Sequence, residues 1–145
     1  MKTNPRRALT VAGFAIALAL VASPLNAQQG KFTLPVEAHW GNAVLSPGSY
    51  RLSGPSPTST MGVIYIYGDK KAQMALPVVA TPLDISNHSY LRLVNVGGTY
   101  VVREFSSGMT GRSYLFGIPK TLRLHMSPKA DHDLATLINI DVSGN

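Results

Sequence analysis

The chain of 145 residues contains no cysteine. This absence excludes a disulfide framework, a thiol nucleophile, thiolate metal ligands and lipid attachment through a cysteine side chain. Concentrated positive charge is missing as well, because no basic run is longer than two residues, such as Lys70-Lys71. Nucleic-acid binding needs a clustered basic patch, and we therefore expect no nucleic-acid partner.

The familiar catalytic and nucleotide-binding motifs are also missing from the sequence. It contains no G-x-S-x-G nucleophile elbow, no H-E-x-x-H zinc motif and no glycine-rich phosphate loop. A carboxylate pair for glycoside hydrolysis would need distant residues such as Glu37 and Glu104, and nothing marks these two. We therefore expect a non-catalytic protein without a cofactor.

What the N-terminus does contain is the pattern of an export signal. Lys2, Arg6 and Arg7 precede an uncharged apolar run over residues 8–22, and Ala27 stands at a cleavage site. The run is shorter than the ~20 residues that span a bilayer. We predict a cleaved signal-peptide helix over residues 1–27, no membrane span after cleavage, and a periplasmic or extracellular location. An uncleaved anchor and twin-arginine export remain alternatives.

Beyond this leader, apolar and polar residues alternate, and turn dipeptides separate the alternating segments. This pattern is typical of β-strands, and no segment has the 3.6-residue period of an amphipathic helix. We predict one all-β domain over residues 28–145, either an antiparallel β-sandwich or a small partly closed β-barrel. The expected strands are residues 31–36, 38–45, 49–53, 62–67, 71–79, 90–96, 99–105, 113–118, 121–126 and 134–142.

Two glycine-containing turns predict hairpins. Gly68-Asp69 and Gly97-Gly98 each separate alternating segments and suit a two-residue turn with positive φ. The second turn would pair Val96 with Thr99. Because two unpaired guanidinium groups are costly to bury, the face with the arginines should point outward. The inward face is then Leu91, Leu93, Tyr100 and Val102, and the outward face is Arg92, Val94, Val101 and Arg103.

The C-terminal segments and the Pro47-Gly48 dipeptide complete the expected sheet. Residues 121–126 should direct Leu122, Leu124 and Met126 inward, and residues 134–142 carry a second apolar row. So apolar a last strand should be paired on both sides or covered. Pro47-Gly48 suits a turn between two strands, which makes Tyr50 an inward anchor with its hydroxyl bonded at the rim.

Aromatic side chains offer one candidate binding site. Tyr65 and Tyr67 share one face of a strand that ends at Gly68-Asp69, with Ile64 and Ile66 on the opposite face. Exposed rings of this kind can stack on sugar rings, and Trp40 is the third candidate. The alternative is that these rings are ordinary core or half-buried sheet residues, because aromatic residues favour strands.

A polar cluster near the C-terminus offers a candidate metal site. Imidazole and carboxylate groups suit zinc or another divalent ion, and the cluster has both. No recognised ligand spacing is present, so a solvated loop is the favoured interpretation. The cluster consists of His125, Asp131, His132 and Asp133.

The segment over residues 32–50 reads F-x-L-P-x-E-x-x-W-G, followed by L-x-P-G-x-Y, and is accompanied later by Leu91-Arg92-Leu93-Val94 and Ile118-Pro119-Lys120. With these elements the chain resembles a family of small exported bacterial proteins. The resemblance implies an exported β-domain and supplies no catalytic residue.

These observations favour an exported, non-catalytic β-domain with a binding or structural role. One alternative is a carbohydrate- or cell-wall-binding module that uses exposed aromatic rings. Another is a metal-dependent enzyme at His125 and His132. The expected partner is an envelope polysaccharide or another envelope protein.

Overall fold

The computed structural model describes residues 29–55, 62–124 and 138–144. These residues are almost entirely β-structure, as predicted. None of the described residues forms a helix with the length and hydropathy of a bilayer span. The elements are β1 (Gln29–Leu34), β2 (Ala38–Trp40), β3 (Ala43–Leu45), β4 (Gly48–Ser53), β5 (Ile64–Tyr67), β6 (Ala72–Ala75), β7 (Val79–Pro82), β8 (Ser89–Val96), β9 (Thr99–Ser107), β10 (Arg112–Leu115), α1 (Lys120–Arg123) and β11 (Ile138–Gly144).

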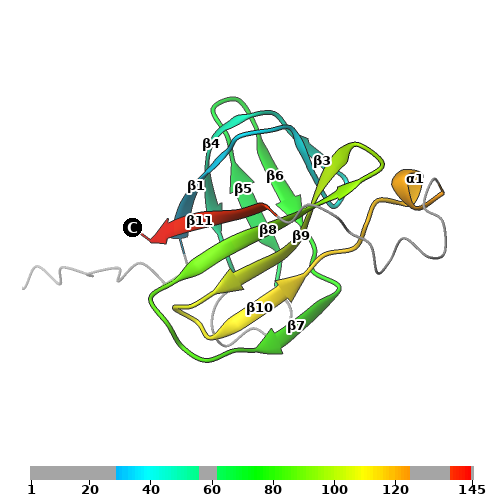
Figure 1. Ribbon diagram of the computed structural model, residues 1–145. Coiled ribbons are helices and arrows are strands. Elements are labelled where there is room, and N and C mark those ends of the chain that lie inside the picture. The colour runs from blue at the N-terminus through cyan, green and yellow to red at the C-terminus, as the bar shows by residue number, and fades with distance from the viewer. Residues whose placement is uncertain (1–28, 56–61, 125–137, 145) are drawn as a thin grey trace, which may run out of the picture.

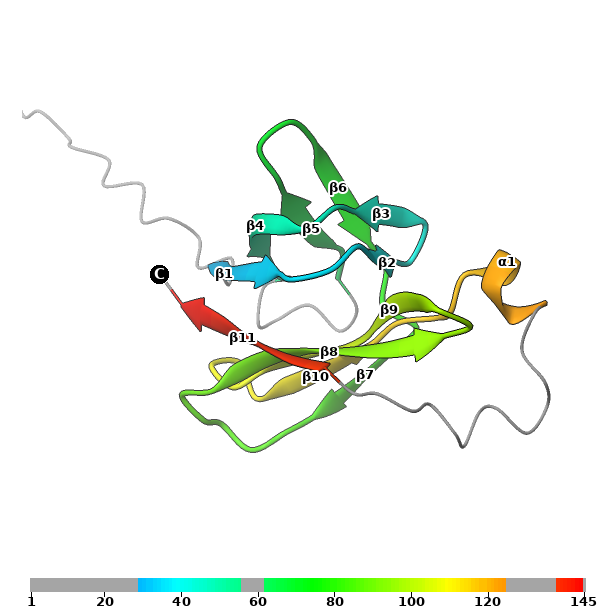
Figure 2. The same ribbon diagram turned by 45° about the horizontal axis from the view of Figure 1, so that its top comes forward.

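The strands form a nearly closed, barrel-like sheet, the second of the two predicted architectures. The strand order is β3-β2-β9-β8-β11-β1-β4-β5-β6, and every pair is antiparallel except β2 with β9. The sheet curls so that its two ends approach each other, and Gln73 Nε2 on β6 lies 3.5 Å from the Val44 carbonyl oxygen on β3. In Figure 2 the strands β1 to β6 lie over β7 to β11.

Strand β9 divides the sheet into two branches. Its first part pairs with β2 through Tyr100 and Val101, and its later part pairs with β10, which in turn pairs with β7. Between these parts the register with β8 shifts by one residue, because Leu91 pairs with Phe105 whereas Leu93 pairs with Val102. Such a bulge increases the local twist of a strand. It therefore separates the branch that closes the barrel from the branch that extends the sheet (Figure 1).

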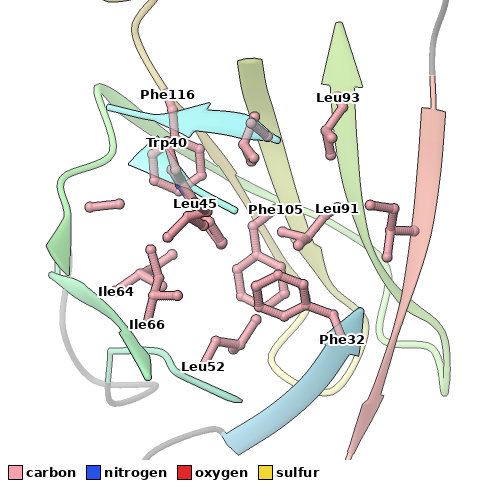
Figure 3. Packing of buried hydrophobic residues seen from close by; sticks show 14 of the residues in the cluster. Phe32, Trp40, Leu45, Leu52, Ile64, Ile66, Leu91, Leu93, Phe105 and Phe116 are labelled. Atoms are coloured by element: carbon pink, nitrogen blue, oxygen red, sulfur yellow. The ribbon is translucent and has the colours of Figure 1, made fainter. Parts of the chain in front are cut away.

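The core lies between the two walls of this sheet (Figure 3). Trp40 contacts Phe116 edge-on at a ring-centroid distance of 5.2 Å and Phe32 at 5.9 Å. The inner face of the β8–β9 hairpin is as predicted, with Leu91, Leu93 and Val102 fully buried. The other fully buried large side chains are Leu34, Leu45, Leu52, Ile64, Ile66, Val101, Phe105 and Tyr114.

The predicted turns at Pro47-Gly48 and Gly97-Gly98 are confirmed in position. β3 ends at Leu45 and β4 begins at Gly48, and Val96 pairs with Thr99 across Gly97-Gly98. Tyr50 is the inward anchor that the sequence indicated. Its ring stacks on Phe32 at 5.5 Å, and its hydroxyl donates a 2.7 Å hydrogen bond to the Ser46 carbonyl oxygen.

The prediction of a strand over residues 121–126 is wrong for residues 121–124, and residues 125 and 126 lie outside the described residues. Residues Lys120–Arg123 form the short helix α1, because the Pro119 carbonyl oxygen accepts hydrogen bonds from the backbone N–H groups of Leu122 and Arg123. Leu122 packs with Ile118 over Val94 and Val101, which lie on the outer face as predicted but are buried there. This local helix covers a part of the outer face that would otherwise expose apolar side chains.

Other strand boundaries also differ from the prediction. The expected strand over 38–45 is the hairpin β2–β3, which turns at Gly41 with a φ of 60°. The expected strand over 71–79 is interrupted around Pro77, which lacks the N–H group that a ladder needs. The C-terminal strand begins, among the described residues, at Ile138. It pairs with both β8 and β1, and Ile140 and Val142 face the core as expected.

Candidate ligand-binding face

The outer surface of β1, β4 and β5 carries a cross-strand row of one aromatic and two cationic side chains. Lys31 on β1 pairs with Arg51 on β4, and Arg51 pairs with Tyr67 on β5. In the next row Ser53 pairs with Tyr65. We call the surface formed by these five residues the β1–β4–β5 face; its strands lie side by side in Figure 1.

The two tyrosines of this face project into solvent. Tyr65 and Tyr67 are 44% and 40% exposed, whereas Ile64 and Ile66 between them are fully buried in the core. The predicted alternation along this strand is therefore confirmed. Residues two apart on a strand lie about 7 Å apart along it. The two rings thus form adjacent apolar platforms with polar hydroxyls.

Two hollows adjoin the β1–β4–β5 face. The larger, of about 1000 Å³, extends toward β11 and the loop before β8. The smaller, of about 270 Å³, lies against β1, β4 and β5. Lys31, Arg51 and Tyr67 line both hollows. A linear ligand that passed from one hollow to the other would therefore contact all three side chains.

The charges are distributed unequally between the hollows. Asp69 and Asp141 line the larger hollow, whereas none of the described residues that line the smaller one is acidic. Within the described ranges Lys31 and Arg51 take part in no ion pair. His88, at the wall of the larger hollow, lies 3.4 Å from Asp141, but both side chains are well exposed, so the pair contributes little stability.

A second outward tyrosine and arginine lie on β8, and there the arginine is paired with an acidic side chain. Arg92 Nη1 lies 2.9 Å from Glu104 Oε2, and the guanidinium lies 5.5 Å from the centre of the Tyr90 ring. Arg92 also donates a 3.3 Å hydrogen bond to the Tyr90 hydroxyl, and Ser113 donates one of 2.6 Å to Glu104. These four residues, the β8–β9–β10 cluster, bind one another within the chain, although Arg92 Nε has no hydrogen-bond partner among the described residues.

Trp40 does not belong to the candidate binding face. Its side chain is fully buried, and its neighbours Phe32 and Phe116 enclose the ring. The expectation that it stacks on a sugar together with Tyr65 and Tyr67 is wrong, because β2 directs this ring into the core. The Trp40 Nε1 group has no hydrogen-bond partner there.

The candidate metal ligands lie outside the described residues. These are His125, Asp131, His132 and Asp133. In the part of the chain that the structure describes, no group of three or more His, Asp or Glu residues is arranged to hold a metal ion.

Sequence reasoning identified the two tyrosines but missed Lys31 and Arg51. Alternation along each strand could have placed both outward. Their position beside Tyr67 depends on the register between strands, and local patterns do not encode it. The chain matches no family model, no curated protein and no solved structure. The geometry of the face must therefore support any functional assignment.

Proposed function

We propose that this chain is an exported, non-catalytic domain that binds a polysaccharide on the β1–β4–β5 face. The observation that carries the proposal is the pair of solvent-exposed rings, Tyr65 and Tyr67, of which Tyr67 lines both hollows. Sugar rings have apolar faces and hydroxyl rims, and a tyrosine offers a flat apolar ring with a polar tip. A carbohydrate chain therefore suits this surface better than a compact apolar ligand, which would need an enclosed pocket.

The polar side chains around the rings support the same ligand class. Ser49, Ser143 and Asn87 line the larger hollow, together with Asp69 and Asp141. Sugar hydroxyl groups both donate and accept hydrogen bonds, and this mixture of hydroxyl, amide and carboxylate groups offers partners for both.

Export is the second part of the proposal and rests on the sequence of the leader. Its basic residues, uncharged run and small residue at position 27 are typical of a cleaved signal. A protein exported in this way meets envelope polysaccharides or other envelope proteins. The mass of the exported form tests this part: removal of residues 1–27 is expected, and an intact Met1 would contradict it.

Affinity electrophoresis through gels that contain polysaccharide tests the binding. We expect Tyr65→Ala and Tyr67→Ala each to weaken retention about 2- to 10-fold, as loss of a stacked ring typically does. Ile85→Ala is the matched control, because Ile85 is 81% exposed and lies outside the face. All three variants should keep the melting temperature of the parent. Retention that is the same in the parent and both tyrosine variants would refute the proposal.

A further inference from the structure

The β1–β4–β5 face places two positive charges directly opposite each other. Lys31 and Arg51 are register partners on adjacent antiparallel strands. Side chains at such positions have Cβ atoms about 5 Å apart, and like charges there are destabilising. Neither has a compensating carboxylate in the described part of the chain. The two charges therefore repel each other across the strands, and an anionic ligand would relieve this repulsion.

Elsewhere in this molecule, an outward arginine beside a tyrosine binds a carboxylate. In the β8–β9–β10 cluster, Arg92 lies beside Tyr90 and contacts the Glu104 carboxylate at 2.9 Å. Arg51 also lies beside a tyrosine, Tyr67, but the position opposite it on β1 is occupied by Lys31 instead of an acid. A carboxylate is the one component of the first arrangement that the second lacks.

The smaller hollow is where an anionic group fits. Among the described residues its polar lining is Gln29, Lys31, Arg51, Ser53 and Tyr67, which supply two cations and hydrogen-bonding groups but no acid. Arginine can bind a carboxylate through two parallel N–H···O bonds, which orient a planar group. The acidic residues line the larger hollow only, and there they can accept hydrogen bonds from sugar hydroxyls.

We propose that the polysaccharide recognised by this face is acidic and bears carboxylates on its sugar rings. One carboxylate lies between Lys31 and Arg51 in the smaller hollow, its ring stacks on Tyr67, and the polymer continues into the larger hollow. This inference rests on the proposed polysaccharide binding and adds the chemical class of the ligand.

The test compares two forms of one polymer. Oligogalacturonate carries a carboxylate on every ring, and its methyl ester has the same backbone without the charge. Calorimetric titration of the mature chain should give at least ten-fold tighter binding of the acid than of the ester. Arg51→Gln should weaken binding of the acid by about ten-fold and binding of the ester by no more than about two-fold, because the ester keeps its contacts with the rest of the face. Arg51→Lys should recover part of the loss, because it restores the charge without the two-pronged geometry.

Arg123→Gln is the matched control, because it removes the same charge from the exposed helix α1, away from the face. Equal losses for Arg51→Gln and Arg123→Gln would mean attraction to net charge and would overturn the inference. Equal binding of acid and ester by the parent, lost in Tyr67→Ala, would overturn the acidic ligand and leave polysaccharide binding intact. No binding of either form, nor of any neutral polysaccharide, would overturn both proposals.

Discussion

Two parts of the outer surface contain a tyrosine beside an arginine, and they differ in the residue that lies opposite the arginine on the adjacent strand. In the β8–β9–β10 cluster, Glu104 lies opposite Arg92 and its side chain is only 13% exposed. On the β1–β4–β5 face, Arg51 lies opposite Lys31 and both are exposed. The same residue types are structural in one place because the chain supplies the anion. They are available to a ligand in the other place because the chain does not.

The difference arises from strand register. The bulge in β9 shifts its pairing with β8 by one residue, so Glu104 pairs with Arg92 and Phe105 with Leu91. Both the ion pair and the buried aromatic ring depend on that shift. No bulge interrupts the pairing of β1 with β4, where consecutive residues match from Gln29↔Ser53 to Leu34↔Gly48. The regular register aligns the two cations and leaves them without an anion.

The largest expected loss of stability comes from substituting the buried aromatic ring, and substitution of an exposed ring should have little effect. Trp40→Ala should lower the free energy of unfolding by about 3–5 kcal/mol, because it empties a site enclosed by Phe32 and Phe116. Tyr67→Ala should change it by no more than about 0.5 kcal/mol. Urea denaturation measures both. Where Trp40→Ala does not fold, Trp40→Phe should give an intermediate loss, and a loss for Tyr67→Ala as large as that would contradict the assignment of Tyr67 as a surface residue.

A smaller difference in stability is expected between removing the partner of Arg92 and removing Arg51 itself. Glu104→Gln should lower the free energy of unfolding by about 1–2 kcal/mol, because it leaves the half-buried guanidinium of Arg92 without its charged partner. Arg51→Gln should leave it unchanged or raise it slightly, since it relieves the repulsion from Lys31. Denaturation at low and at 0.5 M salt checks both variants. If Arg51→Gln were the more destabilising of the two, the β1–β4–β5 face would have a structural role and the comparison would fail.

Much of the fold could be predicted because it follows from alternation. Period-two patterns placed Leu91 and Leu93 inward and put Tyr65 and Tyr67 on the face opposite Ile64 and Ile66, and the structure agrees. The α1 segment could not be predicted in this way. Its local sequence alternates like a strand, but it forms a helical turn that covers Val94 and Val101 on another part of the chain. Tertiary packing therefore overrode the local pattern there.

The candidate site was predictable only in part, and for a related reason. Alternation gives the face on which a side chain lies but not its neighbour on the next strand. Arg51 and Tyr67 become neighbours through the pairing of β4 with β5, and Lys31 joins them through the pairing of β1 with β4. The burial of Trp40 could not be predicted, because a lone aromatic residue in a short strand gives no sign of which face is buried.

Tyrosine ionisation offers a further contrast between the inside and the outside of the sheet. Burial raises the pKa of Tyr114 above its usual value of 10, despite the opposing effects of nearby Arg112 and a hydrogen bond with Thr110. The folded protein thus holds this proton more tightly than the unfolded chain does. The stability contributed by Tyr114 is complete below pH 10 and declines as the pH rises from 10 through the raised pKa. Urea denaturation at pH 8 and pH 11 should show a smaller alkaline loss for Tyr114→Phe than for the parent, and equal losses would contradict the burial effect.

A small effect on stability is expected when the Lys31–Arg51 pair is converted into a pair of an acid with an arginine. Lys31→Glu places a carboxylate opposite Arg51, as Glu104 lies opposite Arg92. The free energy of unfolding should rise by no more than about 1 kcal/mol, because the new pair is exposed. Binding of oligogalacturonate should fall further than in Lys31→Gln, since the introduced acid occupies the guanidinium and also repels the ligand. Titration of both variants measures this difference. If Lys31→Glu bound the acidic polymer as tightly as Lys31→Gln does, the guanidinium of Arg51 would not be the group that receives the carboxylate.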